Sequence, residues 1–178
     1  MEDTIVTIRF TDPGEARRAL HRLKELDRDK ELRVREAALV QRSGQGRIGV
    51  PDEARDADGF FMAPGGIVGM TVDALGGPLG TLFRPPTEGF RGHGARPAHQ
   101  GEREVALEQI SRDLEPGVTL VIAELAGADP DVLGATLEAL GGTVTTRAAA
   151  DVYAELRAAE RAADLTSGFR HMVKNNFP

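Results

Sequence analysis

The chain opens with apolar side chains at every second position, the spacing of a strand with one buried face. These side chains are Val6, Ile8 and Phe10, within residues 4–10. The pair Asp12-Pro13 then marks a helix start, because the aspartate accepts free backbone N–H groups and a first-turn proline loses no hydrogen bond. Apolar residues follow at helical spacing: Ala16, Ala19, Leu20, Leu23 and Leu26.

A second strand is predicted over residues 34–42. Residues 43–46, Ser-Gly-Gln-Gly, have the composition of a hairpin turn and predict a short return strand over residues 47–50. Together with the first strand and helix, they form a β-α-β-β unit.

The C-terminal half repeats this order. After a helix marked by apolar positions over residues 107–114, a strand is predicted at residues 118–122. A second Asp-Pro pair, Asp129-Pro130, opens a helix that ends at Gly141-Gly142, and residues 143–146 predict another strand. An Ala-rich helix follows. The two Asp-Pro caps hold equivalent places, which indicates an internal pseudo-repeat.

Two pseudo-repeated β-α-β units with right-handed crossovers predict a ferredoxin-like α+β sandwich, an open sheet with helices on one face. We divide the chain into a first unit (residues 1–51), a glycine-rich helical insert with a polar Arg/His loop (52–101), a second α-β-α-β unit (102–148), a C-terminal helix (149–164) and a tail (165–178).

The insert contains an apolar stretch, residues 60–83, in which Asp73 is the only charge. Small residues four apart line one side of a helix and let another backbone approach closely. The glycines with this spacing are Gly65 and Gly69, and Gly76 and Gly80. Because each glycine costs a helix about 1 kcal/mol relative to alanine, this helix needs a tightly packed partner.

A single membrane span over this stretch is disfavoured, because it would place the two β-α-β units on opposite sides of a membrane, whereas the pseudo-repeat predicts that they share one sheet. Asp73 near its centre, and Pro64 and Pro78, weigh further against insertion. We expect a helix or broken helical hairpin packed against protein, or a helix lying shallowly at a membrane surface.

Large apolar side chains are concentrated outside the predicted sandwich. Of seven phenylalanines, only Phe10 lies within it. Because such side chains are typical interface anchors, we expect the insert and the tail to pack on each other across subunits of a homo-oligomer. The alternative is a loose tail and an insert that covers its own sheet. The candidate interface residues are Phe60, Phe61, Phe83, Phe169, Met172 and Phe177, with Gly65, Gly69, Gly76 and Gly80.

Composition excludes several function classes. The 178 residues carry 22 Lys and Arg against 28 Asp and Glu, so electrostatic nucleic-acid binding is disfavoured. The absence of cysteine from the sequence excludes disulfides, thiolate metal sites and thiol catalysis. The acidic N-terminal sequence lacks the basic region of a signal peptide, so a cytoplasmic location is expected.

Motifs for chemistry are weak. His93 and His99 lie in a Pro/Gly/Arg-rich loop without a third ligand at zinc spacing, and the Gly65–Gly69 run lacks the context of a phosphate-binding loop. Burial of Asp73 would raise its pKa and make it a candidate proton or cation site; the alternative is an N-cap for a helix over residues 74–82. We expect no enzymatic activity and no cofactor.

Three stretches carry a family resemblance: the hairpin EAALVQRSGQGRIGV, the centre GGIVGMTVDALGGPLGTLF, and DLEPGVTLVIAEL followed by LGGTVTTRA. They resemble the bacterial domain-of-unknown-function family twelve-sixty-nine, whose members are often labelled membrane proteins. The resemblance spans most of residues 4–160 and implies no catalytic activity. This chain departs from the family pattern in having a polar Arg/His loop after its one glycine-rich segment.

Three functions remain. The first, which we expect, is a homo-oligomerising assembly protein whose partner is a second copy of itself. The second is a peripheral membrane protein, with the insert at the bilayer surface and the arginines Arg84, Arg91 and Arg96 at anionic head groups. The third is a small-molecule sensor whose sheet face uses Asp73 or His93 as a polar contact. The sequence identifies no particular small molecule.

Overall fold

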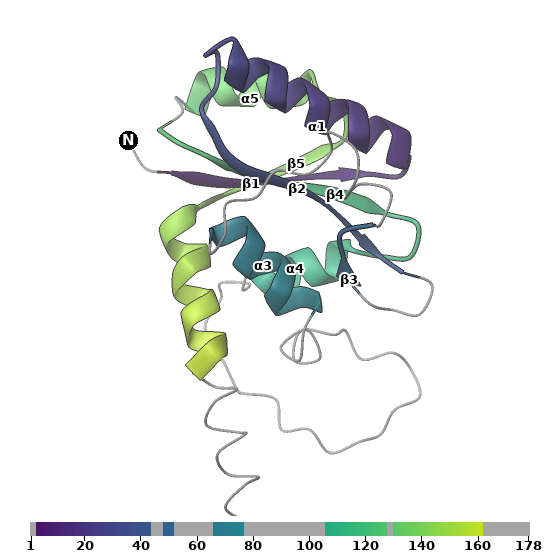
Figure 1. Cartoon of the computed structure of the whole chain (residues 1–178), viewed down its shortest axis with the longest axis vertical. Helices are drawn as coiled ribbons and strands as arrows, with labels where there is room; N and C mark the ends of the chain where they lie inside the picture. Colours follow the sequence, from purple (N-terminus) through teal and green to yellow (C-terminus); the bar gives the residue numbers. More distant parts are fainter. Residues whose placement is uncertain (1–2, 44–47, 52–65, 77–105, 128–129, 162–178) are drawn as a thin grey trace, which may run out of the picture.

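A five-stranded antiparallel sheet crosses the middle of the molecule, with helices above and below it (Figure 1). The computed structural model describes residues 3–43, 48–51, 66–76, 106–127 and 130–161. In the sheet the order is β3-β2-β4-β1-β5. The strands are β1 (Thr4–Phe10), β2 (Val34–Arg42), β3 (Ile48–Gly49), β4 (Thr119–Leu125) and β5 (Thr143–Ala148). The protein is therefore of the α+β class.

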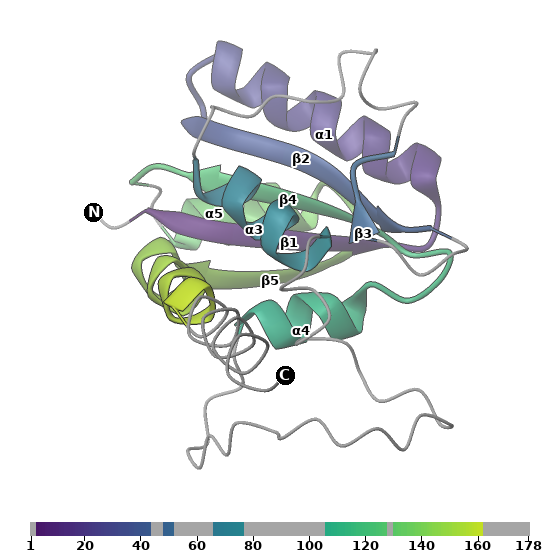
Figure 2. The same ribbon diagram turned by 60° about the horizontal axis from the view of Figure 1, so that its bottom comes forward.

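Two helices, α1 (Pro13–Arg28) and α5 (Pro130–Glu138), cover one face of the sheet. The opposite face is covered by α3 (Ile67–Gly76), α4 (Ala106–Asp113) and the helix over residues 149–161 (Figure 2). The two halves of the chain join in this one sheet, because β2 pairs with β4 along most of its length.

Local patterns predicted the first elements well. The bounds of β1 and β2 agree with the predicted strands, and α1 begins at Pro13 as expected. The Asp12 carboxylate accepts a hydrogen bond from the backbone N–H of Gly14 at 2.7 Å, which is the predicted N-cap. The residues predicted at helical spacing are all buried.

Helices cover both faces of the sheet, and the expectation of helices on one face is wrong. One buried cluster contains Val6 and Ile8 with residues of α1, and a second contains Ile5 with residues of α3 and α4. In β4, Leu120 and Val121 are neighbours that point to opposite faces, yet both are buried. A strand that is apolar at successive positions must be covered on both faces. The sequence of β4 has this pattern, so it already indicated cover on both faces.

Three strands differ from prediction in their ends, and one of them is β4, which begins one residue later than predicted and continues to Leu125. β3 is shorter than the predicted return strand, and β5 continues two residues beyond the predicted end at Thr146. α5 ends at Glu138, and Gly141 and Gly142 follow with φ angles of 72° and 96°, which favour glycine. Within the predicted insert the structure describes residues 66–76, and the remainder lies outside the described residues.

Candidate functional site

The outer edge of β5 is one border of the sheet, because β5 is last in the strand order. Its inner edge pairs with β1 in the register Thr7↔Thr145 and Ile8↔Val144. At the end of this ladder the backbone N–H of Ala149 donates to the carbonyl oxygen of Asp3 at 2.9 Å. This bond fixes which residues of β5 turn their backbone groups toward β1.

In an antiparallel pair, hydrogen-bonded and non-hydrogen-bonded positions alternate. Since residue 149 bonds to residue 3, the groups of Arg147, Thr145 and Thr143 also point toward β1. The N–H and C=O groups of the alternate residues point outward. These are Val144, Thr146 and Ala148. Within the described chain no strand pairs with this outer edge.

β5 has few of the features that protect an edge strand from pairing. It is six residues long, contains no proline, and Arg147 is its only charged residue. All of its residues are exposed or partly exposed. The other border, β3, spans only two residues. Thus β5 is the longer edge available to another chain.

A small pocket lies beside β5 on the face that carries α4. The volume inside it that can hold water is about 10 Å³. A single water molecule needs about 10–15 Å³ of such space, so this pocket is no larger than one water site. The lining residues come from β1, α4, β5 and the helix over residues 149–161: Ile5, Thr7, Gln109, Ile110, Thr145, Arg147 and Val152.

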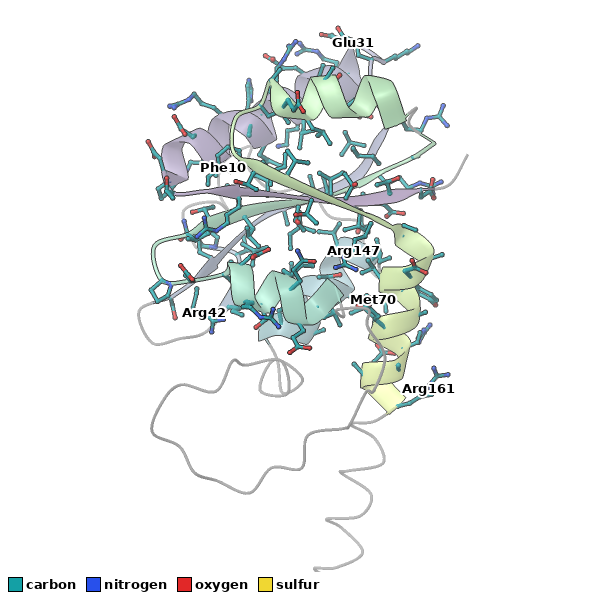
Figure 3. The ribbon with its side chains drawn as sticks, turned by 180° about the vertical axis from the view of Figure 1, so that it is seen from behind. Phe10, Glu31, Arg42, Met70, Arg147 and Arg161 are labelled. Carbon is teal, nitrogen blue, oxygen red and sulfur yellow. The ribbon has the colours of Figure 1, made fainter. Side chains whose placement is uncertain are left out.

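Arg147 is the charged residue that lines this pocket. In Figure 3 it lies between the sheet and the helices on that face. Its guanidinium Nη2 donates to the Gln109 side-chain oxygen, a neutral acceptor. Among the described residues no carboxylate pairs with Arg147, whereas Arg9 and Arg35 each lie within 4.0 Å of one. Within the described residues, Arg147 is therefore partly buried beside a neutral hydrogen-bond partner.

A buried carboxylate attaches α3 to the sheet. Glu36 on β2 is 2% exposed, and its Oε2 accepts a hydrogen bond from the backbone N–H of Val68 at 2.8 Å. Val68 lies in the first turn of α3, where free N–H groups and the helix dipole favour a negative charge. The preceding residue, Gly66, has no side chain to obstruct the approach: a Cβ there would overlap the Glu36 carboxylate.

Glu124 lies directly opposite Glu36 in the pairing of β2 with β4. Burial raises the pKa of Glu124, the nearby Arg35 lowers it, and the charges of Glu36 and Asp3 raise it further. Arg35 sits at an irregularity in the register of β2, and its guanidinium lies 2.9 Å from a carboxylate oxygen of Asp3 and 4.0 Å from one of Glu124. The arginine offsets part of the acidic charge at this end of the sheet.

The described residues of the predicted glycine zipper are engaged within the chain. Gly69 is buried in α3, which packs against its own sheet. A Cβ on Gly76 would overlap the backbone carbonyl oxygen of Ile48 in β3. At Gly76 a backbone therefore does approach closely, but it belongs to the same chain.

Asp73 is exposed, and α3 runs through it without a break. Neither the buried proton site nor the N-cap proposed for Asp73 is therefore present in this helix. The other predicted site residues lie outside the described residues: Phe60, Phe61, Gly65, Gly80, Phe83, His93, His99, Phe169, Met172 and Phe177.

Two other kinds of site are absent from the described residues. No group of three or more metal-ligating side chains lies close enough together to hold an ion. Nor does any described helix have the length and apolar composition needed to span a membrane.

Sequence reasoning missed Glu36 and Arg147. Glu36 shares the two-residue period of Ala38 and Val40, which face the α3 side of the sheet, so its burial was detectable. Arg147 has no such pattern, because its burial depends on α4, which is distant in sequence. Comparison with protein-family models, curated proteins and solved structures found no match to this chain.

Proposed function

We propose that this chain is a non-enzymatic, self-associating protein in which β5 pairs with β5 of a second copy. The observation that carries the proposal is the row of outward N–H and C=O groups at Val144, Thr146 and Ala148. Edge groups of this kind are complementary to another strand, and pairing would extend the sheet across a twofold axis.

An antiparallel pairing centred on Thr146 satisfies these groups reciprocally. Val144 then pairs with the partner subunit's Ala148, and Thr146 pairs with the partner subunit's Thr146. Arg147 faces the partner subunit's Thr145, so that no two arginines lie opposite each other. Threonine pairs across strands are favourable.

Strand pairing of this length is weak alone, since each hydrogen bond adds only about 0.5–1.5 kcal/mol net. Additional apolar contacts are needed for a stable oligomer. The phenylalanines of the insert and tail, with the zipper glycines that lie outside the described residues, are our candidates for these contacts. Their composition is typical of interface anchors.

We also propose that the fold is ferredoxin-like and that the resemblance to family twelve-sixty-nine reflects kinship. The order β5-β1-β4-β2, with α1 and α5 on one face, supports the first assignment. The glycine-rich centre and the two flanking units support the second. Neither assignment adds a catalytic role.

Replacement of Thr146 by proline tests the edge directly. The Thr146 N–H points away from β1, so Thr146→Pro removes an intermolecular donor without removing a bond to β1. Thr146→Val is the matched control, because it keeps the N–H and removes only the hydroxyl. We expect light scattering after size exclusion to give an oligomeric mass for the wild type and Thr146→Val, and a smaller mass for Thr146→Pro.

Circular dichroism and urea unfolding would establish that Thr146→Pro remains folded. A monomeric wild-type chain at high micromolar concentration would overturn self-association altogether. Equal oligomeric masses for both variants would overturn the β5 edge as the contact. In the second case, Phe169→Ser combined with Phe177→Ser would test whether the tail alone holds the oligomer together.

A further inference from the structure

We propose that Glu36 and Glu124 form a proton-binding pair that couples the attachment of α3 to pH. Uptake of a proton by Glu124 holds the helix on the sheet, and loss of that proton loosens it. The two residues lie on β2 and β4, away from the outer edge of β5. The proposal therefore does not depend on pairing of β5.

The first argument is that α3 takes its N-terminal cap from another strand. The backbone N–H of Met70 donates to the carbonyl oxygen of Gly66, which makes Gly66 the N-cap residue of the helix. Glycine has no side chain that could accept the free N–H groups of the first turn. Glu36 supplies that acceptor to Val68 at 2.8 Å. The start of α3 therefore depends on a carboxylate in the sheet.

The second argument is that the sequence of α3 does little to stabilise a helix by itself. It contains two glycines and four β-branched residues, and both classes favour a helix less than alanine does. Its only charged residue, Asp73, is exposed. A short helix of this composition is held mainly by packing on the rest of the protein. A weaker bond to Glu36 should therefore loosen α3 without unfolding the sheet.

The third argument is the position of a second carboxyl group beside this cap. Glu124 pairs directly with Glu36 on β2 and with Ile5 on β1. Directly opposite residues of antiparallel strands share a face of the sheet, and Ile5 packs with residues of α3. The Glu124 side chain is 14% exposed and Glu36 is 2% exposed. Like charges directly opposite each other are unfavourable, so ionisation of both groups weakens this arrangement.

The charges around Glu124 favour proton uptake. Among the described residues, the charged groups that act on it are Asp3, Arg35 and Glu36. The half-exposed Arg35 lies 2.9 Å from Asp3 but 4.0 Å from Glu124. Arg147 on β5 is two strands away and bonded to α4. Burial and the two acidic neighbours raise the pKa of Glu124 against the opposing effect of Arg35.

The direction of the coupling follows from comparing the attached helix with a detached one. Detachment would admit water to Glu124 and bring its pKa back toward the ordinary value of 4.5. The attached state therefore binds the proton more tightly. Attachment is strengthened as the pH falls through the raised pKa toward 4.5, and it is weakest above that window.

Loosening of α3 would expose an apolar surface. Ile67, Val72 and Leu75 are all buried in the attached helix. Detachment would bring these side chains into contact with water. The proton on Glu124 thus controls how often an apolar helix becomes accessible.

The experiment is amide hydrogen exchange of the ¹⁵N-labelled full chain at neutral pH and at about pH 5. Each rate is expressed as a protection factor relative to an unstructured peptide, which removes the intrinsic effect of pH on exchange. We expect Val68 and Met70 to be less protected than Val6 in β1, because α3 opens locally. On acidification the protection factors of Val68 and Met70 should rise at least about threefold.

Glu124→Gln resembles the protonated side chain, so it should give Val68 high protection at both pH values. Glu138→Gln is the matched control, because it removes an exposed glutamate of α5 on the opposite face of the sheet. This control should keep the pH dependence of the wild type.

A second measurement tests the pair directly. Glu36→Gln keeps an oxygen acceptor for Val68 but removes the charge opposite Glu124. The midpoint of the Glu124 carboxyl titration, followed by ¹³C NMR, should therefore lie closer to 4.5 in this variant than in the wild type.

Three results would overturn the proposal. Equal protection of Val68 and Val6 under all conditions would show that α3 does not detach separately from the sheet. A pH dependence at Val68 that is absent from the wild type, or that persists in Glu124→Gln, would remove Glu124 as the controlling group. An unchanged Glu124 midpoint in Glu36→Gln would show that the two carboxyl groups are not coupled.

Discussion

Glu36 and Gly66 lie so close together that the carboxylate of Glu36 occupies the space that a Cβ of residue 66 would need. Glu36 is on β2, and Gly66 immediately precedes α3. The absence of a side chain at residue 66 lets the carboxylate reach the first turn of the helix and bond to Val68. A side chain at residue 66 is therefore incompatible with the observed position of the Glu36 carboxylate.

Gly66→Ala should destabilise the protein. The added methyl group forces the buried carboxylate away from Val68, and overpacking of this kind costs about 1–3 kcal/mol. Urea unfolding measures the effect. Gly134→Ala is the matched control, because nothing lies within 4 Å of its Cβ and it is inside α5. The control should be neutral or more stable, since alanine favours helices. Equal stability of the wild type and Gly66→Ala would contradict the close contact.

Glu36→Ala should weaken the packing of α3 on the sheet more than it weakens the backbone hydrogen bonds of β1. The Val68 N–H loses its buried acceptor, a loss of about 1–3 kcal/mol. Amide hydrogen exchange should therefore accelerate at Val68 by a larger factor than at Val6. Glu138→Ala, which removes an exposed glutamate from α5, should change neither rate. A uniform acceleration at both amides would instead indicate loss of global stability alone.

Glu124→Gln should raise stability at neutral pH. The folded-state pKa of Glu124 is raised, chiefly by burial, so the folded chain binds this proton more tightly than the unfolded chain. Stability is therefore gained as the pH falls through the raised pKa toward the ordinary value of 4.5, and the ionised group is unfavourable above that window. Arg35 offsets part of this cost.

The measurement for Glu124→Gln is urea unfolding as a function of pH. The wild type should gain stability between neutral pH and the ordinary glutamate pKa relative to the variant, and the two curves should converge as Glu124 becomes protonated. The contact with Arg35 spans 4.0 Å with a half-exposed arginine, so its loss is expected to cost little. A variant less stable than the wild type at neutral pH would show that this contact dominates.

Gly76→Ala should destabilise the packing of α3 on β3, because the new methyl group would overlap the Ile48 carbonyl oxygen. Backbone cannot yield as a flexible side chain can, so urea should unfold the variant at lower concentration. Gly49→Ala is the control, since nothing lies within 4 Å of its Cβ. If Gly76→Ala keeps the wild-type stability but lowers the oligomeric mass, the glycine acts between chains instead.

Local patterns were sufficient for elements whose signals are contained in a few neighbouring residues. The alternation over residues 4–10, the Asp12 cap and the helical spacing of α1 identified these elements with accurate bounds. Gly141 and Gly142 marked the end of α5 in the same local way. Both have positive φ angles, which glycine adopts readily because it has no side chain.

The candidate site was less accessible to sequence reasoning. The spacing of Gly76 indicated a close backbone approach but not that the neighbour is β3. Arg147 resembles any surface arginine until α4 brings Gln109 beside it. The outward orientation of Thr146 follows from the register of β5 with β1, a long-range pairing.

By itself the sequence determined the class of each major element, the two similar units and the absence of thiol chemistry, because backbone preference and side-chain type act over short distances. The tertiary structure alone decided which faces of the sheet are covered, which strand forms its outer edge, and which charged side chains are buried. These properties depend on residues far apart in the chain that share one place in the fold. Glu36, a polar residue among apolar neighbours in β2, becomes a helix cap only when α3 packs above it.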